Sequence, residues 1–188
     1  NNRNSEAAGF YRPGLDSRNI QAIYPDGFLP LIATTSKDRA FVAGIRGTTA
    51  NYWHWDLSGN YGKNSLQFDV DHSLNTQLGP TSPTHFYAGT LNNSEKLLNA
   101  DFSRELDVGG LASPVTLAFG GEYRHENYSI DAGDPTSYFG GGSQVFPGFR
   151  PADAGSNSRH SYAVYGELDA DITQKLSGYA RWIHDYDD

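Results

Sequence analysis

Two pairs of acidic residues have spacings that could support chemistry. Asp131 and Asp134 lie across a glycine in "DAGD", and such carboxylates could offer oxygen ligands to Ca²⁺. The EF-hand pattern is absent, and a plain Asp-Gly turn explains the same residues. Glu122 and Glu126 could serve a glycosidase, but they share one strand with Arg124 between them. Residues four apart on a strand are roughly 13 Å apart, too far for either glycosidase geometry. We therefore expect ion pairing facing the lumen of a barrel there.

The remaining reactive residue types do not form a recognisable site. The six histidines show no HxxxH or HxH spacing, and no GxSxG elbow is present. The chain has no cysteine, which excludes disulfides and thiolate metal sites. The sequence predicts no enzyme, metal centre or cofactor.

Composition favours strands over helices. Only 37% of the 188 residues are hydrophobic, while the chain contains 12 Tyr and 21 Gly. The longest apolar run, "FLPLIA", contains Pro30 and is far shorter than the roughly 20 residues of a transmembrane helix. Strands of a membrane barrel are not excluded, because they are apolar only at every second position.

Charge and the first residues narrow the class of protein further. The net charge is −8, and the sequence shows no Lys/Arg cluster that could neutralise phosphates, so we expect no nucleic-acid partner. The opening "NNRNSEAAGF" has neither an initiator methionine nor a signal sequence. We expect a mature or excised segment of a longer protein.

The stretch "YWHWDLSGNY" alternates apolar and polar residues. Trp53 and Trp55 fall on one face of the strand, together with Leu57, and His54 and Asp56 fall on the other. The apolar phase shifts after "GKN" at 62–64 and again near Asn127, which predicts β-bulges. The same alternation recurs in the strands expected at 93–108, 113–131 and 158–171.

Arg104 breaks this alternation, since it falls on the apolar face of its strand. We expect its side chain either to snorkel toward the nearby turn or to mark a local bulge.

Seven strands can be placed, with alternating long and short connections. Tight links allow only antiparallel hairpins, so all long connections should lie at one end of the sheet. This is the layout of a membrane meander. The strands are expected at 4–12, 31–47, 52–73, 93–108, 113–131, 158–171 and 175–186, the long loops at 13–30, 74–92 and 132–157, and the short links at 48–51, 109–112 and 172–174.

A soluble β-sandwich also alternates polar and apolar residues and stays open on pattern alone. Strands of roughly 16 to 22 residues exceed the usual length in globular sheets. The loops also segregate by length, and Trp53 and Trp55 follow a short turn, where an aromatic girdle would lie. We therefore expect both tryptophans to face lipid headgroups at the periplasmic edge of a membrane.

With these features, the chain resembles the barrel of TonB-dependent outer-membrane receptors. The similar stretches keep the order of that family and span nearly the whole sequence. They are "IYPDGFLP" (23–30), "GIRG" with "YWHWDLSGNYGKN" (44–47, 52–64), "FGGEYRHENYSIDAGDPTSY" (119–138), and "GSQVFPGFRPADAG" with "SRHSYAVYGELDADITQKL" (142–155, 158–176).

The resemblance implies a fold, a location and a role. The fold is all-β, an antiparallel up-and-down meander of about seven long strands that forms part of a 22-stranded transmembrane barrel in the bacterial outer membrane. The implied role is TonB-energised uptake of a scarce nutrient, such as a ferric siderophore, cobalamin or an oligosaccharide. In that family a plug domain and a TonB box couple the barrel to the inner membrane, and neither is recognisable in residues 1–188.

Aromatic residues in the long loops are the candidate ligand contacts, since loops on a rigid scaffold often carry recognition. The alternative is that these rings pack the loops against each other. The candidates are Tyr24, Phe28, Phe86, Tyr87, Tyr138, Phe139, Phe146 and Phe149.

Two further expectations concern the rival function and the isolated chain. The rival is a soluble secreted β-sandwich that binds or cleaves polysaccharide through surface aromatics. For the isolated chain we expect self-association, since about seven strands cannot close a barrel.

Overall fold

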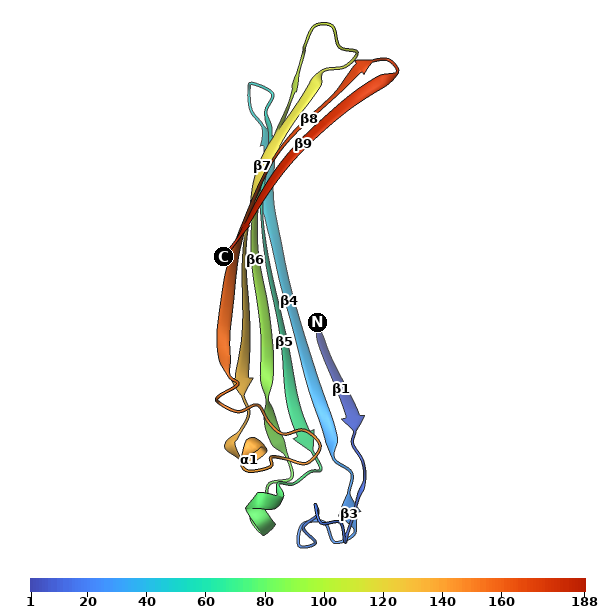
Figure 1. Ribbon diagram of the computed structural model, residues 1–188, viewed down its shortest axis with the longest axis vertical. Helices are drawn as coiled ribbons and strands as arrows, with labels where there is room; N and C mark the ends of the chain where they lie inside the picture. The colour runs from blue at the N-terminus through green and yellow to red at the C-terminus, as the bar shows by residue number, and fades with distance from the viewer. The chain divides into compact units, whose positions relative to one another are not determined.

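The computed structural model describes all residues 1–188 as an all-β chain with one seven-stranded antiparallel sheet. Strands that follow one another along the chain pair side by side, in the order β1-β4-β5-β6-β7-β8-β9 (Figure 1). The strands are β1 (Asn2–Ala8), β4 (Leu31–Thr48), β5 (His54–Asp71), β6 (Phe86–Leu106), β7 (Val115–Ala132), β8 (Gly155–Thr173) and β9 (Leu176–Asp187).

The connections hold the remaining elements. A small second sheet pairs β2 (Arg12–Pro13) with β3 (Gly27–Phe28). A 3-10 helix, η1 (Thr76–Thr81), and one short helix, α1 (Pro135–Tyr138), follow. None of the helices is both long and apolar enough to cross a bilayer.

The predicted meander of seven strands is confirmed, and its sheet is open, with β1 and β9 at the edges. The two packed sheets of a β-sandwich are not what the structure shows. One boundary was wrong: β6 begins at Phe86, not at residue 93. The sequence "FYAGTLNN" has the glycine and asparagines of a loop, but Phe86 and Ala88 are buried. Gly89 has a φ of 119°, a backbone conformation that only glycine adopts easily.

The alternation of long and short connections is confirmed. The long connections cover 9–30, 72–85 and 133–154, and the short ones cover 49–53, 107–114 and 174–175. Contacts divide the chain into two compact units, and all three long connections belong to unit 1 and all three short ones to unit 2. Unit 1 comprises Asn1–Arg39, Lys63–Ser94 and Asn127–Asn157, and unit 2 comprises Ala40–Gly62, Glu95–Glu126 and Ser158–Asp188.

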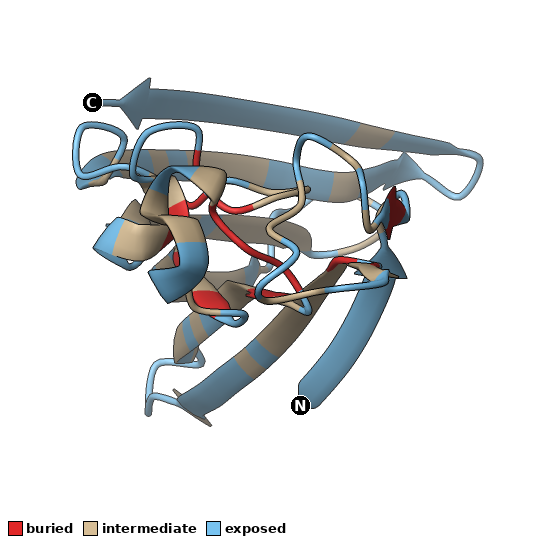
Figure 2. Ribbon diagram, turned by 90° about the horizontal axis from the view of Figure 1, so that it is seen from below, coloured by how far each residue is buried: buried red, intermediate tan, exposed pale blue.

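Unit 1 contains the buried core of the chain. Val70 of β5 and Phe86 and Ala88 of β6 are buried, and Val145 and Phe146 of the connection 133–154 pack against them. Figure 2 shows that the buried residues gather among the connections. The core of unit 1 therefore depends on a loop folded over strand residues.

Unit 2 is an open part of the sheet with two different faces. In the β8–β9 pair, Val164 lies opposite His184 and Gly166 opposite Trp182, and the intervening Tyr165 lies opposite Ile183. Since side chains alternate along a strand, Val164 and Trp182 share one face while Tyr165 points to the other. A register shift between Asp171 and Thr173 marks an irregularity close to the final turn.

Candidate functional site

The buried amide of Asn75 joins two of the long connections of unit 1. Its Nδ2 donates to the carbonyl oxygens of Thr136 at 2.9 Å and Phe139 at 2.8 Å. Its Oδ1 accepts from the backbone N–H of Gln77 at 3.1 Å, where Asn75 caps η1. The side chain is fully buried, so these three hydrogen bonds satisfy an amide that has no access to water.

A second set of hydrogen bonds fastens the same two connections. The Ser73 hydroxyl donates to the carbonyl of Gln144 at 2.9 Å, and the Gln144 N–H donates to the carbonyl of Leu74 at 3.0 Å. Ser143, also buried, donates from its hydroxyl to the carbonyl of Phe146 at 2.8 Å. The connections 72–85 and 133–154 therefore form one hydrogen-bonded assembly.

Tyr24 attaches the first long connection to this assembly. Its ring stacks on Phe28 with centroids 4.8 Å apart, and its hydroxyl donates to the carbonyl of Ser73 at 3.3 Å. Partial burial raises the pKa of the Tyr24 hydroxyl, and a hydrogen bond with Thr84 opposes that rise.

An ion pair orders the exposed part of the same connection. Asp16 Oδ1 accepts from the Arg18 N–H at 2.8 Å and from its Nε at 2.9 Å, and Asp16 Oδ2 accepts from the guanidinium at 2.7 Å. The Arg18 hydrogen bonds lower the pKa of the Asp16 carboxyl below its usual range. The two side chains therefore stabilise a turn in this connection.

Four of the eight candidate ligand contacts pack inside unit 1. Phe28 and Phe86 are buried and offer no surface to a ligand in this structure. The Phe146 ring stacks on Phe68 with centroids 5.2 Å apart, and Phe149 meets both rings edge-on. For these four residues the structure agrees with the alternative in which aromatic rings pack the loops together.

The other four candidates keep some surface. Tyr24, Tyr87 and Tyr138 are half-buried, and Phe139 is 55% exposed. The Tyr87 hydroxyl forms a 2.7 Å hydrogen bond with Thr90 Oγ1. Tyr138 and Phe139 end α1 and lie next to the Asn75 contact, so the connection 133–154 presents them from a fixed backbone.

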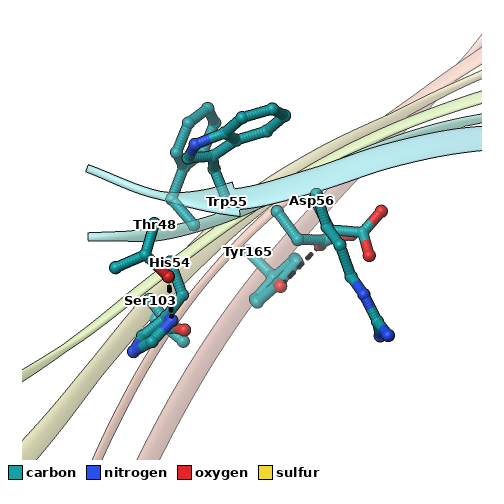
Figure 3. Close-up of a pocket in the computed structure, with 11 residues that line it drawn as sticks. Thr48, His54, Trp55, Asp56, Ser103 and Tyr165 are labelled. Carbon is teal, nitrogen blue, oxygen red and sulfur yellow. Dashed lines mark hydrogen bonds between the residues drawn. The ribbon is translucent and has the colours of Figure 1, made fainter. Parts of the chain in front are cut away.

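A cleft of about 610 Å³ lies in unit 2 and is called here the polar cleft after the polar side chains in its lining. These are Arg46, Thr48, His54, Asp56, Asp101, Ser103 and Tyr165, and Trp55, Phe102 and Ala118 also line it. Tyr165 donates from its hydroxyl to Asp101 Oδ1 at 2.7 Å, and the Arg181 guanidinium lies 5.6 Å from the centre of the Tyr165 ring. His54 Nδ1 and Thr48 Oγ1 lie 3.0 Å apart at the same cleft. Figure 3 shows Thr48, His54 and Tyr165 on one side of the strands and Trp55 on the other.

The opposite face of unit 2 carries an aromatic cluster beside the short turns. Trp53 meets Phe119 edge-on at 5.6 Å, and Phe119 stacks on Phe102 at 5.3 Å. The guanidinium of Arg104 lies over the Trp53 ring, 5.9 Å from its centre. The arginine that breaks the apolar pattern thus has a cation–π partner on the apolar face, next to the turn 49–53.

The acidic residues considered for chemistry have structural partners. Glu122 Oε1 accepts from the Arg124 guanidinium at 2.8 Å, and Glu126 Oε2 lies 2.6 Å from the Arg159 guanidinium. The predicted ion pairing of both glutamates is confirmed. Asp131 accepts from Asn92 Nδ2 at 2.9 Å. No three His, Asp or Glu side chains come close enough to hold a metal ion.

Sequence reasoning missed the polar residues that organise both units. Apart from the cap that Asn75 provides for η1, the hydrogen bonds of Asn75 and Ser73 leave no local pattern in the sequence, because the carbonyls that accept from them lie more than 60 residues away. Tyr165 did carry a signal, since it is an aromatic residue at a polar position of its strand. Comparisons with protein-family models, curated proteins and solved structures find no match for this chain.

Proposed function

We propose that the chain forms part of the 22-stranded transmembrane barrel of a TonB-dependent receptor in the bacterial outer membrane. Its role is recognition and passage of a small nutrient. Outer-membrane lipid surrounds its apolar face, and the TonB system supplies the energy for transport. In that family coupling runs through a plug domain, so the proposal assigns no coupling role to residues 1–188.

The observation that carries this proposal is the pair of unlike faces in unit 2. Most of the large exposed apolar side chains of unit 2 lie along one face, whereas the other face carries the polar cleft with Asp101 and Tyr165 and fewer such residues, among them Val42 and Ile183. An exposed apolar surface of this extent indicates a partner or a membrane. Its exposed members include Phe41, Ile45, Leu57, Tyr61, Leu98, Phe119, Tyr162, Val164, Leu168, Trp182 and Tyr186.

All three tryptophans of the chain belong to this apolar face. Trp53 contacts Phe119 of β7. Phe119 shares its face with Gly121, two residues along, and a β-carbon at Gly121 would lie 3.6 Å from Val164 Cγ1, so Trp53 and Val164 lie on the same face. Trp182 lies opposite Gly166, two residues after Val164. Trp55 follows Trp53 at the next alternate position. Tryptophans at a membrane interface would have this arrangement.

The polar cleft supports passage of the nutrient, and the connections of unit 1 support its recognition. The cleft is lined by carboxylate, hydroxyl, imidazole and guanidinium groups from β4, β5, β6 and β8. The Thr48 hydroxyl lies 3.0 Å from His54 Nδ1, but no third group orients this imidazole as a nucleophile's base requires. Among the loop candidates, Tyr138 and Phe139 have a fixed backbone and an exposed or half-exposed ring. Together these features suit binding without covalent chemistry.

Quenching of tryptophan fluorescence by brominated lipid tests the proposal. The purified chain is reconstituted from detergent into vesicles of phosphatidylcholine or of its dibrominated form. Because all three tryptophans share the apolar face, most of the emission should be lost in the brominated vesicles. Emission equal in both vesicles would contradict a membrane-facing sheet.

A matched variant controls for quenching that does not depend on the face. In it, Trp53, Trp55 and Trp182 are replaced by Phe and Tyr165 by Trp, which moves the single fluorophore to the polar face. Its emission should be quenched far less than that of the parent chain. Equal quenching of parent and variant would show contact with lipid on both faces and would also contradict the proposal.

A further inference from the structure

Three cationic side chains meet in unit 1 on two neighbouring strands. Lys37 and Arg39 of β4 and Lys63 and Ser65 of β5 line a cleft of about 150 Å³. The sequence showed no basic cluster, because Lys63 is distant along the chain from Lys37 and Arg39. Pairing of β4 with β5 brings these residues together, and this corrects the expectation that the chain has no Lys/Arg cluster.

No carboxylate neutralises this cluster. None of the three cations takes part in an ion pair or in a side-chain hydrogen bond of the structure, although Arg3, Arg18, Arg124 and Arg159 do. Asp38 is adjacent in sequence, but it pairs with Arg3 and accepts from Asn64. Since side chains alternate along a strand, Asp38 and Asn64 point to the face opposite Lys37 and Lys63.

An uncompensated cationic cluster favours a bound anion. Like charges on neighbouring strands repel each other and lower stability, and an anion between them adds attractions that offset this repulsion. The guanidinium of Arg39 can donate two parallel hydrogen bonds to phosphate, and the lysines add point charges. The Ser65 hydroxyl can donate a further hydrogen bond at the same cleft.

We propose that Lys37, Arg39, Lys63 and Ser65 form a binding site for the phosphate group of a membrane lipid. That the phosphate belongs to a lipid rests on the proposed function, in which the apolar face lies in a membrane. Lys63 follows Tyr61 at the next alternate position of β5, and Arg39 precedes Phe41 in the same way on β4. On both strands the residues of one face thus change from apolar to cationic within two positions, as they would where acyl chains give way to headgroups.

Extended polyanions do not fit this site. The net charge of −8 repels them, and only three cations meet in the cleft. A single phosphate group is small enough for the cleft, and its oxygens can accept hydrogen bonds from all three cations.

Thermal unfolding of the chain in a neutral detergent tests this site. The additives are dioctanoyl phosphatidic acid, dioctanoylglycerol, which lacks the phosphate, and inorganic phosphate. We expect the phosphatidic acid to raise the Tm of the chain, dioctanoylglycerol to have little effect, and inorganic phosphate to act only at much higher concentration.

Two triple variants remove the same amount of charge. K37Q/R39Q/K63Q should need at least about tenfold more phosphatidic acid for the same rise in Tm, since each lysine or arginine near an anionic headgroup contributes to binding. R3Q/R150Q/K175Q removes three cations outside the cleft and should respond like the parent chain. Equal responses of the two variants, or equal effects of phosphatidic acid and dioctanoylglycerol, would overturn the site.

The remaining outcomes separate this site from the proposed function. Inorganic phosphate as effective as phosphatidic acid would overturn the lipid as its source. A chain with strong quenching by brominated lipid but no response to phosphatidic acid would overturn the phosphate site alone. A chain that responds to phosphate through Lys37, Arg39 and Lys63 without such quenching would overturn the membrane proposal alone.

Discussion

Gly120 of β7 lies directly beneath the ring of Tyr165 on β8. A β-carbon at this glycine would lie 2.6 Å from Tyr165 Cε1 and 2.5 Å from Asp101 Oδ1. The absence of a side chain on β7 therefore allows Tyr165 to reach Asp101 across it, with a hydrogen bond of 2.7 Å. The polar cleft of unit 2 depends on a residue that contributes no side chain.

Gly120→Ala should consequently destabilise unit 2 by about 1–3 kcal/mol, because the added methyl group displaces the Tyr165 ring. Gly166→Ala is the matched control, since a β-carbon there meets no atom within 4 Å. Denaturant unfolding in detergent, followed by circular dichroism, measures both. Equal stability of the two variants would show that Tyr165 does not need the space above Gly120.

Trp55→Asp should lower stability in detergent more than His54→Asp, by about 1–2 kcal/mol, because a carboxylate on a lipid face loses its hydration. The two residues are neighbours in β5 but lie on opposite sides of the strands (Figure 3). Thermal unfolding in a neutral detergent makes the comparison. Equal tolerance of both substitutions would argue against a lipid-facing Trp55.

Phe86→Ala and Phe139→Ala should separate packing from recognition in unit 1. Phe86 is fully buried, so its truncation should cost about 3–5 kcal/mol, whereas Phe139 is 55% exposed and should cost under about 1 kcal/mol. Chemical unfolding measures both costs. A large loss from Phe139→Ala would assign that ring to packing and remove it from the candidate ligand contacts.

Removing a whole loop segment such as 140–150 would not test recognition alone, because this segment contains the buried Ser143 and the core residues Val145 and Phe146. Phe139→Ala keeps the core of unit 1 and tests the exposed ring by itself.

Alkaline titration should reveal the burial of Tyr24. Its folded-state pKa is raised, so its contribution to stability is fully present below the unfolded-state pKa of about 10 and is lost as pH rises through the folded-state value. Tyr24→Phe removes this ionisation. The free energy of unfolding of the parent chain should therefore fall more steeply than that of the variant above about pH 10. Parallel pH profiles would show that Tyr24 ionises equally in both states.

The isolated chain should self-associate through its free strand edges. β1 pairs with β4 only from Leu31 to Lys37, so residues 40–48 of β4 lack a strand partner on that side, and β9 has none on its outer side. Light scattering after size exclusion, without detergent and over a range of concentrations, should show oligomers. A sharp monomer at every concentration would count against the open apolar sheet.

The strands and the order of the connections could be predicted from the sequence because both depend on local patterns. Alternation with a period of two located the strands, and clusters of glycine and polar residues located the turns. The core of unit 1 could not be predicted in this way. Phe68 and Val70 pack on Val145 and Phe146, far along the chain, and their apolar phase indicated a bulge rather than a covering loop.

The surroundings of the candidate ligand contacts were predictable only in part. Tyr24, Tyr138, Phe139, Phe146 and Phe149 lie in or next to the long connections as expected, whereas Phe86 and Tyr87 begin β6. Which rings are buried depends on contacts between the connections, and their role in ligand binding stays a prediction. Asn75 illustrates the limit, since its amide satisfies carbonyls at Thr136 and Phe139 that no local pattern connects to it. The bulges predicted near 62–64 and Asn127 stay predictions, while the irregularity between Asp171 and Thr173 had no signal in the alternation.

The sequential pairing of the strands also sets an order in which the chain can fold. The turns 49–53, 107–114 and 174–175 close short loops, and short flexible loops cost less entropy to close than long ones. The hairpins β4–β5, β6–β7 and β8–β9 should therefore nucleate at these turns and zip away from them. The connections of unit 1 can bury Phe86 and Asn75 only after the strands beneath them have paired, so the long connections should be the last part of the chain to become ordered.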